Sequence, residues 1–254
     1  MKPYYKNELT TIYNGDCLEV MDYLIEQGIK VDAIITDPPY GTTACNWDNV
    51  IPFDKMWERL KLLRKEKTPV ILCGSEPFSS HLRMSNIKEY KYDWIWNKKL
   101  AGNGILAKIQ PLKIHEIVSI FYKHDYYPLK IKGAMRAKMT NNPKVSSING
   151  GDGIKKAKEV INDEYYPTSI IEFTLANLRT NRLHPTQKPL ELMKYLTETY
   201  TKKGDLILDF TSGSFTTCVG ADQLGRKSIG IEMSKEYCDI GIKRLESLQM
   251  RLDI

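Results

Sequence analysis

The sequence predicts an α/β protein built on a doubly wound parallel sheet. Short β-branched, apolar runs alternate with amphipathic, helix-like segments over most of the 254 residues, and this alternation is typical of βα units. The hydrophobic content of 42% is sufficient for one sizeable core. The alternation stops between Lys123 and Asn181, where Asn-Asn-Pro and Asn-Gly-Gly-Asp-Gly indicate loops. We therefore expect one sheet domain with an inserted lobe that carries mobile loops.

Seven strands are expected from runs of β-branched and aromatic residues. In chain order they are residues 11–15, 31–36, 68–73, 90–97, 117–122, 205–210 and 227–232. The run 31–36 is expected to be a short buried strand. In sheets of this kind ligands bind beyond the carboxyl ends of the strands, so chemistry is sought directly after them.

Six helices are expected between these strands, from the 3.6-residue spacing of their apolar residues. They are residues 17–27, 54–66, 77–85, 189–200, about 215–224, and a last one from 234 onward. Gly28 and Gly204 can end two of them, Pro189 can open one, and Ser234 suits an N-cap.

The net charge of +6 is concentrated in the expected lobe. Nine basic residues and three acidic ones lie between Lys123 and Glu159, so the rest of the chain is neutral. This excess favours a polyanionic partner, although a solvated loop explains it as well. The five cysteines form no CxxC pair, and neither a signal peptide nor a membrane span is found. A reduced, cytoplasmic chain without a metal site is expected.

Three of the expected strands end in acids: Asp37, Asp209 and Glu232. Asp209 is followed by small residues, and Glu232 lies 23 positions further on. A small-residue turn at a helix N-terminus, with an acid about 20 residues later, is the layout of a nucleotide or nucleoside site. An ordinary βαβ turn and a nicotinamide-binding site are alternatives at this point.

The segment Asp37-Pro38-Pro39-Tyr40 is more specific. A base that has left the double helix offers an exocyclic amine, which needs acceptors for two N–H groups and a surface for stacking. Asp37 supplies one acceptor, and the prolines hold the Pro38 carbonyl toward the same nitrogen. Tyr40 supplies the aromatic face. A rigid turn after a strand explains Asp37 and one proline only.

These residues resemble the catalytic motif of the DNA amino-methyltransferases, in which Asp, Ser or Asn is followed by Pro-Pro and an aromatic residue. That family methylates adenine N6 or cytosine N4 and uses S-adenosylmethionine. The order of segments, with the catalytic motif first and the donor turn last, is similar to its circularly permuted β class. GTTACNWD and YPTSI resemble segments of small phage and prophage methylases.

The resemblance extends over nearly the whole chain and implies a Rossmann-like methyltransferase sheet of seven strands with an inserted recognition lobe. It divides the chain into a catalytic half (1–122), a basic target-recognition lobe (123–181) and a donor-binding half (182–254). If residues 205–210 and 31–36 are neighbouring strands, Asp209 and Asp37 meet at the switch point of the sheet.

The resemblance also implies which residues act. Asp37, Pro38, Pro39 and Tyr40 would be catalytic. The donor would be held by Asp16, Cys17, Asp37, Thr186, Gln187, Lys188, Asp209, Phe210, Thr211, Gly213, Ser214 and Glu232. Among these, Asp16 would contact the donor adenine and Glu232 its ribose, while Thr186, Gln187 and Lys188 would lie near its methionine carboxylate.

One residue departs from the family pattern. Phe215 stands where the donor turn usually has its second glycine. Phenylalanine favours negative φ; if position 215 begins the helix, this preference is met and the ring can enter the core. Were the backbone required to approach the donor there, binding would suffer, and this motivates a non-catalytic DNA-binding homologue as an alternative.

The function that these observations favour is methylation of adenine N6 in double-stranded DNA. Aspartate rather than serine at position 37 tilts the choice from cytosine N4 toward adenine. The resemblance adds a bacterial or phage-encoded, nucleoid-associated location, and it raises a homodimer and a cognate restriction enzyme as further partners.

Overall fold

The computed structural model describes residues 1–42, 48–139, 159–175, 183 and 187–252. The chain divides into a large unit, Met1–Tyr127 with Ser169–Ile254, and a small unit, Pro128–Thr168. Both divisions fall inside the segment expected to form the lobe, so its two ends belong to the large unit. No helix in these described ranges is long and apolar enough to cross a membrane.

A mixed sheet forms the centre of the large unit, with the strand order β1-β2-β11-β10-β3-β4-β6-β5-β9. Its strands are β1 (Tyr5–Lys6), β2 (Thr10–Asn14), β3 (Ala33–Thr36), β4 (Val70–Gly74), β5 (Tyr90–Asn97), β6 (His115–Phe121), β9 (Ile170–Glu172), β10 (Leu206–Asp209) and β11 (Lys227–Glu232). All seven expected strands are present, but seven was wrong as the total. The additional strands β1 and β9 have two and three residues, too few to show a hydrophobic period.

The expectation of a purely parallel sheet is also corrected. Strands β2, β11, β10, β3 and β4 run parallel, whereas β6 is antiparallel to both β4 and β5. The connection from β5 to β6 contains no crossover helix, only the short 3₁₀ turn Gly104–Leu106. Strands joined in this way pair antiparallel, because a parallel pair needs a crossover of a dozen or more residues, usually helical.

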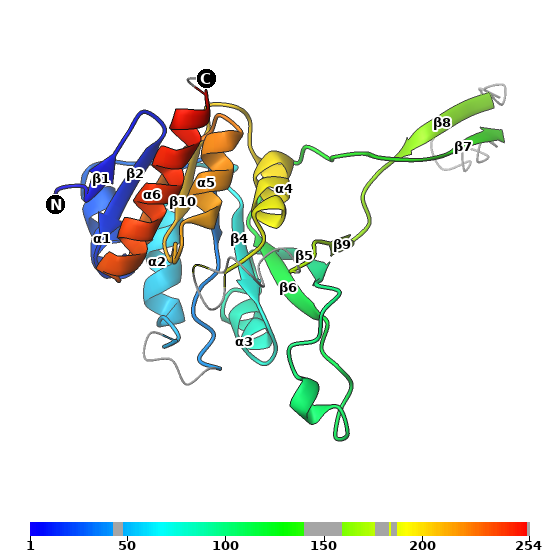
Figure 1. Cartoon of the computed structure of the whole chain (residues 1–254), viewed down its shortest axis with the longest axis horizontal. Helices are drawn as coiled ribbons and strands as arrows, with labels where there is room; N and C mark the ends of the chain where they lie inside the picture. The colour runs from blue at the N-terminus through cyan, green and yellow to red at the C-terminus, as the bar shows by residue number, and fades with distance from the viewer. Residues whose placement is uncertain (43–47, 140–158, 176–182, 184–186, 253–254) are drawn as a thin grey trace, which may run out of the picture. The chain divides into compact units, whose positions relative to one another are not determined.

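Six α-helices cover the two faces of the sheet (Figure 1). They are α1 (Cys17–Glu26), α2 (Phe53–Leu63), α3 (Phe78–Ser85), α4 (Leu190–Tyr200), α5 (Thr216–Gln223) and α6 (Lys235–Leu252). Residues of α1, α2 and α3 pack against one face, and residues of α4, α5 and α6 pack against the other. Helix α2 ends earlier than expected because Arg64 is extended (φ −80°, ψ 150°).

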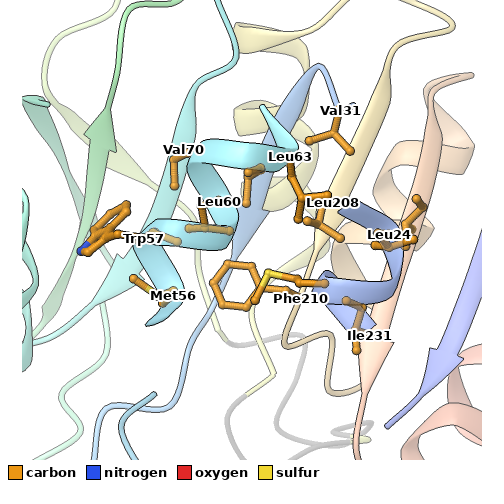
Figure 2. Close-up of a cluster of buried hydrophobic side chains, with 14 of the residues drawn as sticks. Leu24, Val31, Met56, Trp57, Leu60, Leu63, Val70, Leu208, Phe210 and Ile231 are labelled. Atoms are coloured by element: carbon orange, nitrogen blue, oxygen red, sulfur yellow. The ribbon is translucent and has the colours of Figure 1, made fainter. Parts of the chain in front are cut away.

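Successive side chains of each central strand point to opposite faces of the sheet, as strand geometry requires. Ile34 of β3 and Leu208 of β10 belong to the cluster beneath α1 and α2, while Ile35 and Ile207 belong to the cluster beneath α4. Figure 2 shows the first of these clusters, with Phe210 among the side chains of α1, α2 and the neighbouring strands.

The small unit contains an antiparallel pair, β7 (Ile131–Met139) and β8 (Glu159–Tyr165). This part of the lobe was expected to be loops, and the strands went unnoticed because residues 131–136 are all exposed. A strand with no buried face has no hydrophobic alternation to reveal it. The hydroxyl of Tyr165 donates to the Ala134 carbonyl at 2.8 Å and ties the two strands together.

Candidate active site

Two turns contain the residues expected to be catalytic and to bind the donor. We call residues 37–41 the catalytic turn and residues 209–216 the donor turn, and they follow adjacent strands. Strand β10 pairs parallel with β3, with Leu208 opposite Ile34, so Asp209 and Asp37 leave the same edge of the sheet. The two turns touch directly, since the Thr211 hydroxyl lies 3.2 Å from the Asp37 carbonyl oxygen. The expected meeting of these turns at the switch point is thus present in the structure.

Both carboxylate oxygens of Asp37 have a partner. The Tyr40 hydroxyl donates to Oδ1 at 2.5 Å, and Lys188 Nζ donates to Oδ2 at 2.5 Å. Lys188 precedes helix α4 in the chain, so this ion pair joins the two halves of the large unit. The resemblance placed Lys188 near the donor's carboxylate; in the structure its ammonium lies on the Asp37 carboxylate, and the contact with the donor stays a prediction.

A second carboxylate shares Lys188 with Asp37. Glu116 Oε2 lies 3.3 Å from Lys188 Nζ and makes no hydrogen bond, while Glu116 Oε1 accepts from Lys98 Nζ at 3.0 Å. The four groups therefore form a chain of alternating charge that runs from β3 to the start of β6. The sequence did not reveal Glu116, because nothing in its surroundings marks it as different from a surface acid.

The pKa values of these groups reflect their burial and their shared charges. Burial raises the pKa of Asp37, with Glu116 adding to the rise and Lys188 opposing it. Burial alone would lower the pKa of Lys188, but Asp37 and Glu116 together hold it above its usual value. Burial would likewise raise the pKa of Glu116, yet Lys188 and Lys98 keep it below its usual value. Burial thus dominates the pKa of Asp37, whereas the two lysines dominate that of Glu116.

Asp48 holds the backbone of the catalytic turn. Its Oδ1 accepts from the N–H groups of Tyr40 (2.7 Å) and Gly41 (2.9 Å), and its Oδ2 accepts from that of Thr42 (2.9 Å). Gly41 has φ +67°, which suits glycine and lets the turn fold back onto this carboxylate. Asp48 was not among the predicted site residues. Its position shortly after the Asp37–Tyr40 motif could have indicated it.

The Tyr40 ring already has one aromatic neighbour. It stacks on Phe78 of α3, with ring centroids 5.0 Å apart and planes 28° from parallel. Phe78 thus covers part of Tyr40, and the stacking of a target base on this ring stays a prediction. Burial, reinforced by Asp37, raises the pKa of the Tyr40 phenol well above its ordinary value, so the hydroxyl stays protonated and donates to Asp37.

Asp209 anchors the donor turn from inside the sheet. It is buried, and its Oδ1 accepts from the Thr36 hydroxyl at 2.5 Å. Burial raises the pKa of Asp209 to about 6, although hydrogen bonds from Thr36, Thr217 and Thr211 oppose the rise. Phe210, which follows it, has a side chain only 1% exposed and packs in the core.

Glu232 and Asp16 follow β11 and β2, which are paired neighbours. Glu232 Oε2 accepts from the Gly213 N–H at 2.9 Å, and its Oε1 accepts from the Ser234 N–H at 2.8 Å. Each of these oxygens keeps a lone pair for a further donor such as a hydroxyl. Asp16 is exposed and caps α1 by accepting from Leu18 and Glu19 at 2.8 and 3.2 Å.

Phe215 lacks the negative φ that phenylalanine favours, yet its ring enters the core. It precedes α5 rather than beginning it and adopts a left-handed conformation (φ 60°, ψ 32°). The ring is fully buried. A Cβ added at Gly230 or Gly241 would come within 2.6 or 2.3 Å of this ring. These two glycines provide the space that lets a phenylalanine occupy a glycine-like conformation.

Arg244 of α6 supports the same turn from the other side. Its Nη1 donates to the Ser214 carbonyl and lies 3.0 Å from the Thr216 hydroxyl. Burial lowers the pKa of this guanidinium to about 10. This role of Arg244 was not predicted, because the residue lies in a helix whose pattern is simply amphipathic.

A cavity of about 500 Å³ opens between the two turns. Most of the proposed site residues line it, namely Asp16, Cys17, Asp37, Pro38, Pro39, Tyr40, Gln187, Lys188, Asp209, Phe210, Thr211, Gly213, Ser214 and Glu232. Thr186 lies outside the described residues. Phe215 is absent from the described lining, so its ring does not enter the cavity.

Comparison with known proteins places this geometry in a family. A sequence profile described as DNA methylase (N6_N4_Mtase) matches residues 31–243. The DNA adenine methyltransferase YhdJ of Escherichia coli K12 is 28% identical over 258 residues, covering 95% of this chain and 84% of YhdJ.

Two solved structures have similar folds. The M1.HpyAVI–SAM complex superimposes with a TM-score of 0.64 at 25% identity, covering 93% of this chain and 99% of that one. The cytosine-N4-specific PvuII DNA methyltransferase gives a TM-score of 0.65 at 18% identity, covering 96% and 88%. The α/β fold with its large mixed sheet is thus the fold of DNA methyltransferases. The chain belongs to the DNA methylase family that acts on adenine N6 or cytosine N4.

Proposed function

We propose that this protein transfers a methyl group from S-adenosylmethionine to adenine N6 of a flipped-out base in DNA. The observation that carries the proposal is the position of Asp37, whose carboxylate lines the cavity between the two turns and is held there by Tyr40 and Lys188. A carboxylate at this place can accept a hydrogen bond from an exocyclic amine.

The cavity fits the proposed donor. Glu232 offers its remaining lone pairs to ribose hydroxyls, and the N–H of Gly213 fixes the direction of that carboxylate. Asp16 lies at the neighbouring strand end, within reach of an adenine. When bound, S-adenosylmethionine supplies an electrophilic methyl group on a sulfonium. The shape and the acids support this donor, and the complex of M1.HpyAVI with it adds support.

Each oxygen of Asp37 already accepts one hydrogen bond, and we infer that the target amine replaces Lys188 on Oδ2. Lys188 has a second acceptor at hand, since Glu116 Oε2 lies 3.3 Å from its ammonium without a hydrogen bond. The amine then takes the position that Lys188 leaves. The buried charges stay balanced throughout this exchange, which keeps the cost of moving Lys188 low.

Asp37 and the Pro38 carbonyl accept from the two N–H groups of the amine. Two acceptors on one NH₂ group draw the nitrogen lone pair out of conjugation with the ring, which makes the nitrogen a better nucleophile. The ionised Asp37 also stabilises the positive charge that develops on nitrogen as the N–C bond forms. No strong general base is required, since the alkylated nitrogen is acidic and loses its proton to water.

Adenine rather than cytosine as the target base is supported by aspartate at position 37 and by the similarity to YhdJ, a DNA adenine methyltransferase. The fold cannot make this choice, because a cytosine-N4-specific enzyme has a similar one. The alternative of a non-catalytic homologue was motivated by Phe215. Its ring packs against Gly230 and Gly241 and does not line the cavity, which supports donor binding.

The small unit is the proposed target-recognition lobe. Lys132 and Arg136 are exposed on β7, and Lys130 is exposed directly before it, which suits contact with DNA phosphates. The strand order, with the last strands of the chain inserted between β2 and β3, supports a circularly permuted arrangement of the family fold. A homodimer and a cognate restriction enzyme stay predictions.

The test is methylation of unmodified DNA by the purified protein, followed by digestion to nucleosides and mass identification of the product. We expect N6-methyladenine from the native chain and none from Asp37→Ala, with calorimetric binding of S-adenosylmethionine retained in both. N4-methylcytosine would overturn the adenine assignment. Full turnover by Asp37→Ala would overturn the mechanism, and absence of donor binding by the native chain would favour the inactive alternative.

A further inference from the structure

The connection between β5 and β6, residues 98–114, carries an unusual set of exposed apolar side chains. Ile105 is 98% exposed and Ile109 is 79% exposed. Leu106, Leu112 and Ile114 of the same connection are also exposed. Single exposed aliphatic residues need no explanation, but several together on a short segment indicate a surface that meets a partner.

Hydrogen bonds give this connection a defined shape. Asn103 bridges its two arms, since its Nδ2 donates to the Pro111 carbonyl at 3.1 Å and its Oδ1 accepts from the Lys113 N–H at 2.7 Å. Beyond Asn103 the 3₁₀ turn Gly104–Leu106 carries Ile105 at the tip, and the Ile109 N–H donates to the Leu106 carbonyl at 2.9 Å. The connection extends away from the sheet in Figure 1. The two isoleucines are therefore presented by a folded element.

The connection leaves the sheet at the edge that holds the active site. Strand β6 is antiparallel to β4, and Ile117 near its start pairs with Gly74 at the carboxyl end of β4. The base of the connection is also joined to the catalytic turn, because Lys98 pairs with Glu116, which shares Lys188 with Asp37. A substrate bound over Asp37 would thus lie at the same end of the sheet as this connection.

The charge of the connection distinguishes between kinds of partner. It contains Lys98, Lys99, Lys108 and Lys113 and no acidic residue. Lys98 and Lys99 pair with glutamates of neighbouring strands, whereas Lys108 lies exposed beside the apolar tip. A second copy of this chain that met this connection through its own residues 98–114 would bring lysines against lysines, since the segment holds no acidic residue. A DNA duplex attracts the lysines and accepts an aliphatic wedge between its bases.

We propose that residues 98–114 form a wedge that enters the duplex beside the target base, with Ile105 and Ile109 against the bases that flipping leaves unstacked. Extruding a base costs a few kcal/mol of stacking and pairing. Aliphatic side chains that fill the vacated space offset part of this cost. Lys108 then lies at the phosphates on either side. The wedge rests on the proposed function, since it acts only where a base leaves the helix.

The test compares two duplexes that carry the methylated sequence, once mapping of modified bases has identified that sequence. In the first duplex the target base is paired, and in the second it faces an abasic site, which removes the pairing that holds it in the helix. We expect Ile105→Ala with Ile109→Ala to lower kcat/KM on the paired duplex about tenfold and on the second duplex less than about twofold. Fluorescence of 2-aminopurine at the target position should show less flipping of the paired duplex by the double variant.

Control variants separate the wedge from other roles. Leu62→Ala changes an exposed residue at the end of α2, near the opposite edge of the sheet, and should leave both rates unchanged. Ile105→Leu keeps an aliphatic tip and should retain most of the native rate on paired DNA. Lys108→Gln should weaken binding to both duplexes alike. It should also reduce the slope of log Kd against log salt concentration by about one unit.

Equal rates for the double variant and the native chain, or equal losses on both duplexes, would overturn the wedge. A fall in sedimentation coefficient in the double variant would also overturn it, because the tip would then join two copies of the chain. A native chain that methylates no DNA at all would instead defeat the proposed function, and it is recognised before any variant is compared.

Discussion

The catalytic turn (37–41) and the donor turn (209–216) lie at the ends of neighbouring strands, yet they are held differently. Polar groups from distant segments hold the first: Asp48 binds its backbone and Lys188 binds its aspartate. Hydrogen bonds to Glu232 and from Arg244 also hold the second, but it has in addition the packing of the Phe215 ring over Gly230 and Gly241. In the proposed mechanism Asp37 accepts a new partner, which requires bonds that can be exchanged, whereas the donor turn keeps one conformation and benefits from rigid packing.

The largest effect is expected from Lys188→Met, which removes the cation shared by Asp37 and Glu116. With two buried carboxylates and one cation fewer, the pKa of Asp37 should rise further. Asp37 works ionised, so activity is present above its pKa and is lost as the pH falls through it. We expect the acid limb of kcat against pH to move to higher pH, and turnover at pH 7 to fall about a hundredfold. A buried pair broken on one side also costs about 3–5 kcal/mol of unfolding free energy.

Two variants sharpen this prediction. Lys188→Arg keeps the charge and should retain the native acid limb, with a lower rate from altered geometry. Glu116→Gln removes a negative charge that raises the pKa of Asp37, so its acid limb should move to lower pH. Superimposable plots of kcat against pH for the native chain, Lys188→Met and Glu116→Gln would contradict this prediction, because Lys188 and Glu116 would then have no influence on the pKa of Asp37.

The packing of the donor turn is tested by Gly241→Ala. The new Cβ would lie within 2.3 Å of the Phe215 ring, and such overpacking costs about 1–3 kcal/mol. Urea unfolding should show a loss near the upper end of this range, with weaker binding of S-adenosylmethionine. The same change in a Phe215→Ala background should cost little, because the ring is gone. Gly104→Ala, whose Cβ meets no atom within 4 Å, is the matched control.

A smaller, pH-dependent effect is expected at Asp209. Its folded pKa of about 6 lies above the ordinary value of 3.8 because of burial. The stability that this group contributes relative to a neutral one is present below about pH 4 and is lost as the pH rises through 6. Asp209→Asn should therefore gain stability over the native chain with rising pH, by at most about 3 kcal/mol between pH 4 and 7.5. A stability difference that does not change with pH would place the charge of Asp209 in solvent.

The mildest expected effect is that of Asp48→Ala on the catalytic turn. Three N–H groups lose their acceptor, so the turn should fluctuate more and Asp37 should be less well aimed. We expect kcat to fall about tenfold while donor affinity stays unchanged in calorimetry. Asp48→Asn keeps one acceptor oxygen and should lose less. Loss of donor binding together with kcat would show that the two turns are not separately supported.

The strands and the acids at their ends could be predicted from the sequence, because local patterns of residue types are enough to locate them. Apolar runs between breakers located all seven of the expected strands to within two residues, and the acids at their ends located Asp37, Asp209 and Glu232. The meeting of Asp37 and Asp209 followed from a general rule about sheet edges. These inferences needed no knowledge of side-chain packing.

The residues that escaped prediction act through contacts distant in sequence. Glu116, Asp48 and Arg244 are ordinary charged residues until folding places them on Lys188, the Tyr40 backbone and Ser214. The conformation of Phe215 escaped for the same reason, since it depends on Gly230 and Gly241 in two other elements. The reversal of β6 was open to inference, because the connection before it has no helical period.

The position of β10 has a consequence for how the protein is made. This central strand lies between β11 and β3, but it is formed by residues 206–209, near the end of the chain. A nascent chain that still lacks β10 and β11 holds the pair β1-β2 and the block from β3 to β9 as separate pieces, and an edge of each awaits a strand. Unpaired edges of this kind invite association between nascent chains. Folding of the sheet is therefore completed only after synthesis has passed β11, and slowing of translation upstream of Leu206 should lower the yield of native protein.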